Sequence, residues 1–192
     1  MTAALDFFAL IWLTLVNPEL MTRRIMHQTY ERSTLWMGVG LVSILSVLLV
    51  LLVGLISSPV TLPLGASPMA YVLIMACVLI ILTMVLYLTG HMLGGKSTFP
   101  HAFAAVIWLE MTALCVRSVQ AFVSIVSPSA AGILSIVGLV ALLRVLVIFV
   151  NETQRFDSQP RALATIVIAM LGIGFGFGFF LTVIGVSAQL EI

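Results

Sequence analysis

The chain has 192 residues, of which 62% are hydrophobic and 8% are charged, and its mean hydropathy is +1.27. Because a soluble globular domain carries about a quarter of charged residues, this composition excludes that class. The net charge of +1 provides no field for binding nucleic acid, so we expect no nucleic-acid partner. Cys77 and Cys115 lie inside apolar runs without paired spacing, which predicts neither a disulfide framework nor a zinc site.

The first apolar run, residues 3–16, is too short to cross a bilayer. Asp6, Thr14 and the aromatic side chains of Phe7, Phe8 and Trp12 suit a helix that lies at the level of the lipid headgroups. We therefore expect an interfacial amphipathic or re-entrant helix at the N-terminus, and we treat residues 1–32 as a segment separate from residues 33–192.

Five longer apolar runs follow, and each is long enough to cross a membrane as a helix. The expected spans are residues 33–56, 69–88, 100–126, 130–150 and 162–186. These runs predict an all-α fold, an integral membrane bundle of five transmembrane helices preceded by the interfacial helix.

Basic residues mark one side of this bundle. Six of them fall on the side of the N-terminus: Arg23, Arg24, Arg32, Lys96, Arg155 and Arg161. The segments 57–68, 127–131 and 187–192 contain no Lys or Arg. By the positive-inside rule, we expect a cytoplasmic N-terminus and a C-terminus on the opposite side of the membrane.

The span 100–126 contains two charges. Glu110 lies about 15 Å from the start of this span, where a charge costs roughly 2.5–3.5 kcal/mol on insertion scales. Arg117 lies seven residues further along the same face. Arg144 lies about 10 Å inside the next span, so a Glu110–Arg144 pair is geometrically plausible. A direct Glu110–Arg117 contact would bridge about 10 Å of helical rise, which we expect to be strained unless water or Gln120 helps.

These four residues form a candidate intramembrane polar cluster with two possible roles. One role is structural: the cluster is an ion-paired register lock between spans or a docking face for a partner subunit. The other role is a polar site for a lipid headgroup, an ion or a proton.

The last span contains alternating glycines. Gly172 with Gly176 and Gly174 with Gly178 form two small-x-x-x-small pairs on different faces of the helix. We expect these faces to approach neighbouring helices closely, within the chain or between chains.

Residues 90–97, GHMLGGKS, match the phosphate-binding loop pattern G-x-x-x-x-G-K-[ST]. That motif requires a preceding strand in an α/β sheet, whereas here a membrane span precedes the loop. We interpret Gly94, Gly95 and Lys96 as a glycine-rich cytoplasmic turn with one orienting charge, and we expect no nucleotide.

The three histidines do not predict a cofactor. His27, His91 and His101 all fall on the cytoplasmic side, where amphipathic rings are common at the interface. Haem would need axial ligands deeper in facing helices. We therefore expect no metal and no cofactor.

The loop and the span that follows it carry a family resemblance. Residues 91–110, HMLGGKSTFPHAFAAVIWLE, resemble a signature of bacterial members of the Yip (Ypt/Rab-interacting) integral membrane protein family. The matching positions are Gly94, Gly95, Ser97, Phe99, Ala102, Ala105 and Trp108. In the loop before the last span, Glu152, Phe156, Arg161 and Ala162 match, and Arg155 stands where many members have glycine. Residues 15–19, LVNPE, resemble the segment of the family that precedes its membrane domain.

The resemblance implies a five-span bundle with a cytosolic N-terminus, in a bacterial inner membrane with the C-terminus in the periplasm. Eukaryotic relatives act in vesicle traffic and bind Rab-type GTPases, but this chain lacks their Asp-Leu-Tyr-Gly-Pro motif and long N-terminal region. The resemblance therefore does not extend to Rab binding, and it supplies no catalytic residues.

The sequence favours a non-enzymatic membrane protein that acts as an accessory, organising or interaction subunit. Its expected partners are membrane lipids and a larger membrane complex or a homo-oligomer. The first alternative is a transporter or lipid scramblase that uses the intramembrane charges, although inverted repeats and broken helices are absent from the pattern. A membrane-embedded enzyme is the second alternative, and it lacks a Ser-His, Asp-Asp or metal-ligand spacing at one depth.

Overall fold

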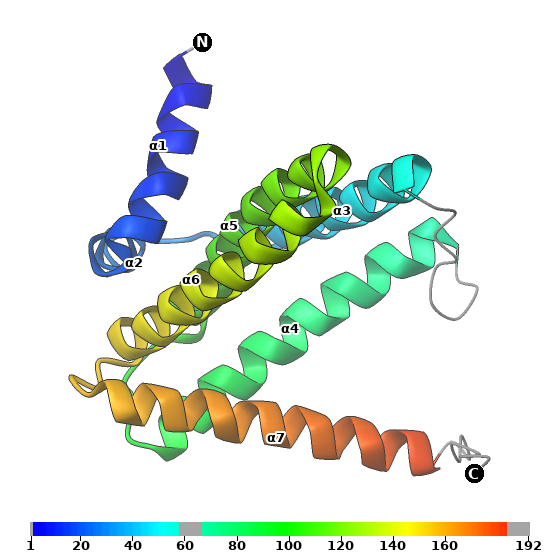
Figure 1. Ribbon diagram of the computed structural model, residues 1–192. Helices are drawn as coiled ribbons and strands as arrows, with labels where there is room; N and C mark the ends of the chain where they lie inside the picture. The colour runs from blue at the N-terminus through cyan, green and yellow to red at the C-terminus, as the bar shows by residue number, and fades with distance from the viewer. Residues whose placement is uncertain (1, 58–66, 184–192) are drawn as a thin grey trace.

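The computed structural model describes residues 2–57 and 67–183, and these ranges form seven helices and no strand (Figure 1). The helices are α1 (Thr2–Val16), α2 (Pro18–Met26), α3 (Arg32–Ser57), α4 (Pro68–Met92), α5 (Phe99–Val126), α6 (Pro128–Gln154) and α7 (Gln159–Val183). Helices α3 to α7 are each long and apolar enough to cross a membrane, which confirms the predicted all-α architecture. Most of the turn expected at 57–68, and the tail after residue 183, lie outside the described residues.

The helices extend beyond the predicted apolar spans because prolines and serines set their starts. Pro68 and Pro128 occupy the first position of α4 and α6, where a missing N–H costs nothing. The preceding residues, Ser67 and Ser127, cap these helices through their hydroxyl oxygens, which accept from backbone N–H groups. Hydropathy registers only the hydrocarbon-length part of each helix, so it misses these polar first and last turns.

Helices α3, α5 and α6 form the packed centre of the molecule. Val42 on α3 and Val145 on α6 are fully buried, and Leu114 on α5 joins the same apolar core. Close packing of such side chains, rather than the hydrophobic effect, holds helices together inside lipid.

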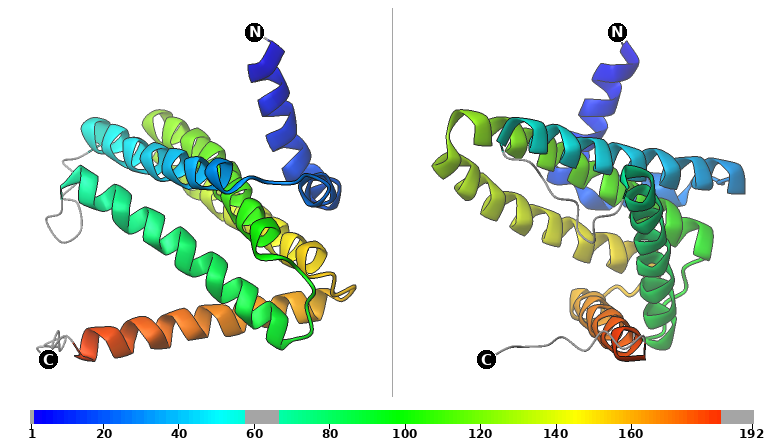
Figure 2. Two further views of the ribbon diagram at one scale, coloured as in Figure 1. Left: turned by 180° about the vertical axis from the view of Figure 1, so that it is seen from behind. Right: turned by 90° about the vertical axis from the view of Figure 1, so that its right-hand side faces the viewer.

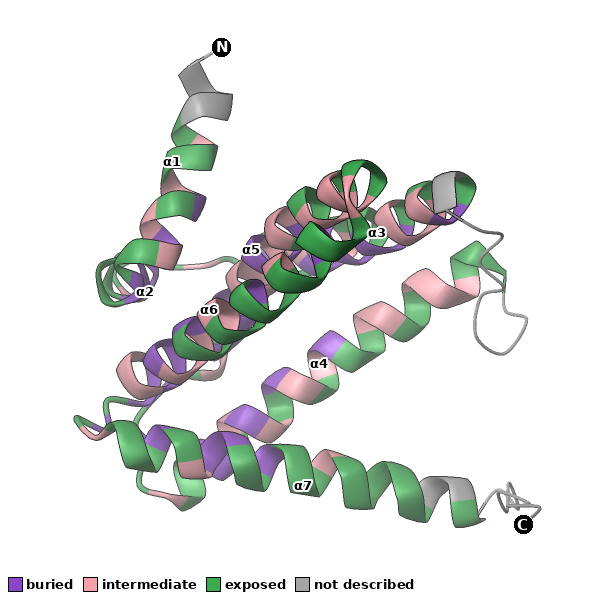
Figure 3. Cartoon of the chain, in the orientation of Figure 1, coloured by how far each residue is buried: buried purple, intermediate pink, exposed green. Residues whose placement is uncertain are grey.

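Helices α4 and α7 pack onto this centre only near one end. All the buried residues of α4 lie between Leu79 and Gly90, and the described buried residues of α7 lie between Ala162 and Ala169 (Figure 3). Beyond these stretches both helices lead away from the bundle (Figure 2).

The packed end is also the basic end, by which we mean the end where α4 and α6 finish and α5 and α7 begin. Arg23 of α2 pairs with Glu152 near the end of α6 at 3.2 Å. The Lys96 N–H donates to the Gln154 carbonyl oxygen at 3.0 Å, which joins the α4–α5 turn to α6. The loops that carry the basic residues thus meet at a single end of the bundle.

Candidate functional site

Glu110 and Arg117 form a direct ion pair on α5. The Arg117 Nη1 group donates to Glu110 Oε1 at 2.7 Å, and the two side chains are 50% and 24% exposed, respectively. Arg117 lies about 27 Å and Glu110 about 16 Å from Phe99 along a helix of about 42 Å, so the pair lies on either side of the middle of α5. The two charged groups therefore meet directly across two turns, because helical side chains lean toward the N-terminus and the Arg117 side chain is long enough to reach back.

Arg144 does not join this pair. Gly138 of α6 faces α5, and Arg144 follows six residues later, which places it about 120° around the helix. Val145 occupies the buried side instead, and Arg144 is exposed. Within the described residues, the ion pairs of 4 Å or less are Glu110–Arg117 and Arg23–Glu152.

Gln120 connects α5 to α6 rather than serving the charges. Its Nε2 group donates to the Leu134 carbonyl oxygen at 3.3 Å. A Cβ atom at Gly138 would lie 2.4 Å from this Nε2 atom, so the contact requires glycine there. This clamp sets the rotation of α6 against α5, and thereby the outward direction of Arg144.

A second glutamine, Gln154, is enclosed by the glycine-rich turn at the basic end. Its side chain is 3% exposed, and Nε2 donates to the Leu86 carbonyl oxygen at 3.3 Å. A Cβ atom at Gly90 would lie 2.1 Å from Gln154 Nε2, and one at Gly95 would lie 2.2 Å from Oε1. The glycines therefore allow close approach of α6, a role that the motif pattern alone does not reveal.

The backbone N–H groups of this turn have their hydrogen-bond acceptors within the protein. The N–H groups of Gly94, Gly95 and Lys96 all donate to protein carbonyl oxygens at 2.9–3.0 Å. Gly94 adopts φ +88°, a conformation that glycine tolerates. A phosphate-binding loop directs its N–H groups at the ligand instead.

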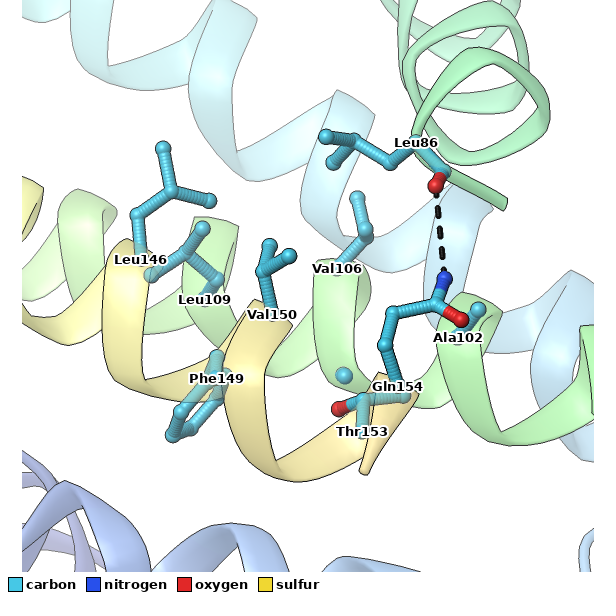
Figure 4. A pocket seen from close by; sticks show the side chains of 10 residues that line it. Leu86, Ala102, Val106, Leu109, Leu146, Phe149, Val150, Thr153 and Gln154 are labelled. Atoms are coloured by element: carbon cyan, nitrogen blue, oxygen red, sulfur yellow. Dashed lines mark hydrogen bonds between the residues drawn. The ribbon is translucent and has the colours of Figure 1, made fainter. Parts of the chain in front are cut away.

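An apolar cavity of about 30 Å³ lies where α4, α5 and α6 meet, next to Gln154 (Figure 4). Its lining is Leu86, Ala102, Ala105, Val106, Leu109, Leu146, Phe149, Val150, Thr153 and Gln154. Substrate pockets usually measure about 300–1,000 Å³, so this cavity is a packing void rather than a binding pocket.

The glycines of α7 face no other part of the described chain. Around a Cβ atom built at Gly172, Gly174, Gly176 or Gly178, no described atom lies within 4 Å. These faces are open to contact with another molecule.

The N-terminal helices dock through contacts that the sequence did not predict. The Trp108 Nε1–H of α5 donates to Thr14 Oγ1 of α1 at 2.9 Å, and the Phe7 ring meets the Trp108 ring edge-on at 6.2 Å. Thr14 is fully buried. A tryptophan N–H inside a membrane needs an acceptor, and that requirement is the signal that could have located this contact.

Two of the three histidines, His91 and His101, take part in separate local contacts. His91 Nδ1–H donates to the Tyr87 carbonyl oxygen at 3.0 Å, and a hydrogen bond of 2.6 Å joins His101 Nδ1 to Thr98 Oγ1. In the described ranges no group of three or more His, Cys, Asp or Glu side chains could hold a metal ion.

Five membrane-length helices, of which α3, α5 and α6 form the packed centre, define an integral, all-helical membrane protein. The family model of the Yip1 domain matches residues 12–181, so the chain belongs to the Yip1 domain family. The match confirms membership of the Yip family, which the loop and span motifs indicated. Neither the curated proteins nor the solved structures include a significant match to the chain.

Proposed function

We propose that this protein is a non-enzymatic accessory or organising subunit that binds another membrane component through the middle of α5. The observation that carries the proposal is the half-exposed Arg117 side chain near the middle of a transmembrane helix. A cation there costs roughly 2.5–3.5 kcal/mol on insertion scales. Among the described residues its side chain has one hydrogen bond, to Glu110, which leaves most of its N–H groups available to a partner.

The open face of α7 supports the same proposal. No residue from Met170 to Phe179 is buried, and Phe175 is 76% exposed. Gly172 to Gly178 lie about 20–28 Å from the start of α7, in the part of this helix that leads away from the bundle (Figure 2). These glycines therefore offer a second open surface to a membrane partner.

The proposal places the protein in a bacterial inner membrane, with the basic end in the cytoplasm and the C-terminus in the periplasm. The gathering of the basic residues at one end supports this orientation through the positive-inside rule. A C-terminal reporter that is active only in the cytoplasm would overturn it.

Site-specific photo-crosslinking in native membranes tests the proposed partner site. A photoreactive residue replaces Ala121, one turn after Arg117 on the same face, and in a control it replaces Phe122 on another face of α5. We expect one stoichiometric protein adduct from position 121 and none from position 122. Equal labelling at both positions, or lipid adducts alone, would contradict the proposal.

A lipid scramblase or transporter is the second candidate function. The Glu110–Arg117 pair favours it, because a carboxylate and a guanidinium side by side complement the ammonium and phosphate of a zwitterionic headgroup. Lipid flux in proteoliposomes that is lost in Arg117→Leu would support this candidate over the subunit.

A further inference from the structure

Helix α1 leads away from the bundle, and its position indicates which surroundings it occupies (Figure 1). The hydrogen bond from Trp108 to Thr14 fixes its level, because Trp108 lies about 14 Å from the start of α5. Helix α5 is about 42 Å long and the hydrocarbon core about 30 Å thick, so about 6 Å of α5 extends beyond the core at each end. This places the contact about 8 Å inside the hydrocarbon, in one leaflet and deeper than the headgroup level that the sequence indicates.

The side chains of α1 point in three directions around the helix, and these are the direction of Asp6, a stripe toward the bundle and an exposed stripe. At 100° per residue, the stripe toward the bundle lies about 80–140° from Asp6 and consists of Phe7, Ile11 and Thr14. Ile11 and Thr14 are buried, and Phe7 meets Trp108. The exposed stripe lies about 200–280° from Asp6 and consists of Phe8, Trp12 and Val16, which are 63%, 70% and 47% exposed.

Only one orientation in a membrane satisfies all three groups. If α1 lies along the membrane plane, Asp6 can point toward the headgroups while Phe8 lies on the opposite side, in the acyl chains. If α1 ran along the membrane normal, Asp6 would share its surroundings with the exposed stripe. Embedding also explains why Trp108 needs Thr14, since its N–H would otherwise meet hydrocarbon without an acceptor.

We propose that α1 is a lipid-embedded arm whose exposed stripe binds the acyl chains of the leaflet at the basic end. The occupant of this stripe is lipid rather than protein, because the arm leads away from the bundle at acyl-chain depth and the stripe contains no charged side chain. Its one polar group is the indole N–H of Trp12, and such an amphipathic ring is typical of the boundary between acyl chains and headgroups. The inference is independent of the proposed partner site, which lies on α5 and α7.

Spin labels at two positions of the arm test the proposal directly. The full chain is labelled at Trp12→Cys or at Asp6→Cys, with Cys77→Ala and Cys115→Ala in the background, and is reconstituted in phosphatidylcholine vesicles. Collisions with oxygen report lipid exposure, and collisions with a soluble nickel complex report water exposure. We expect an oxygen-to-nickel ratio severalfold higher at position 12 than at position 6.

Two results would overturn the proposal. Equal access of nickel to both positions would place α1 in water, and protection of position 12 from both agents would show that a protein, such as a second copy, covers the stripe. If the labelled variants fail to fold, the native chain provides a second measurement. In vesicles brominated midway along the acyl chains, we expect much of the quenchable tryptophan fluorescence to disappear in Trp12→Phe, and an unchanged quenchable fraction would contradict embedding.

Discussion

Substitution of Gly90 by alanine should test whether the glycine-rich turn exists to accommodate Gln154. The new Cβ atom would lie 2.1 Å from Gln154 Nε2 and 2.3 Å from Cδ, so the whole amide group must move. Gln154 is 3% exposed, and its amide group cannot move into solvent without breaking its hydrogen bond to the Leu86 carbonyl oxygen.

The expected cost follows from three terms. The lost hydrogen bond is worth about 1 kcal/mol, and overpacking a close contact costs about 1–3 kcal/mol. Replacing glycine inside a helix returns up to about 1 kcal/mol. We therefore expect Gly90→Ala to lower the free energy of unfolding by about 2 kcal/mol, measured by denaturant titration in mixed micelles.

Gly40→Ala in α3 is the matched control, because no described atom lies within 4 Å of a Cβ atom there. It should leave stability unchanged or raise it by up to about 1 kcal/mol. The double variant Gly90→Ala, Gln154→Ala has no clash. Its loss of unfolding free energy should therefore be smaller than the sum of the losses of the two single variants, by about 1 kcal/mol or more. If Gly90→Ala is as stable as Gly40→Ala, or if the costs add, Gln154 does not explain the glycines.

Three further substitutions test other parts of the structure by the same unfolding titration. Arg117→Leu should cost about 3 kcal/mol because it leaves the Glu110 carboxylate alone in the membrane, whereas leucine at both positions should return to within about 1 kcal/mol of the wild type. Gly138→Ala should cost about 1–3 kcal/mol by displacing Gln120, and Gln120→Ala should relieve that cost. Arg155→Gly should raise stability by about 1 kcal/mol, because Arg155 ends α6 at φ +56°, in the left-handed region.

The predictions for Gly138 and Arg155 each have a further control variant. Gly132→Ala adds a methyl group to α6 with no described atom within 4 Å, so it should not share the cost at Gly138. Arg155→Ala keeps a side chain in the left-handed conformation and should bring no gain. A stabilisation by alanine equal to that by glycine would show that the arginine side chain, not the backbone, sets the cost.

The membrane helices were predictable because hydrocarbon leaves the backbone few choices. A chain without water must satisfy its N–H and C=O groups internally, so a long apolar run forms a helix whatever its neighbours do. Hydropathy could not predict the rotation of one helix against another. Whether Glu110 meets Arg144 or Arg117 depends on the Gln120–Gly138 contact, a detail of side-chain packing.

The burial of Gln154 could not be predicted from the sequence for a different reason. In the sequence it sits in a polar segment at the end of a span, where a glutamine is expected to be solvated. Its burial depends on Gly90 and Gly95, which lie some 60 residues earlier and resembled a phosphate-binding motif. The glycines were visible, but their purpose depends on a contact between α4 and α6 that local patterns do not encode.

The open end of the molecule contains features that differ in what they require of their surroundings. Apolar side chains such as Phe175 lose nothing by facing lipid tails, which are as apolar as they are, so an unpacked α7 is not in itself unstable. Arg117 differs, because its guanidinium has donors that no described residue accepts from and that lipid tails cannot satisfy. The need for a partner therefore originates at Arg117 and not at the glycine faces of α7. If Arg117 is the reason that a partner is needed, leucine at both Glu110 and Arg117 should abolish the adduct at position 121 while the fold survives.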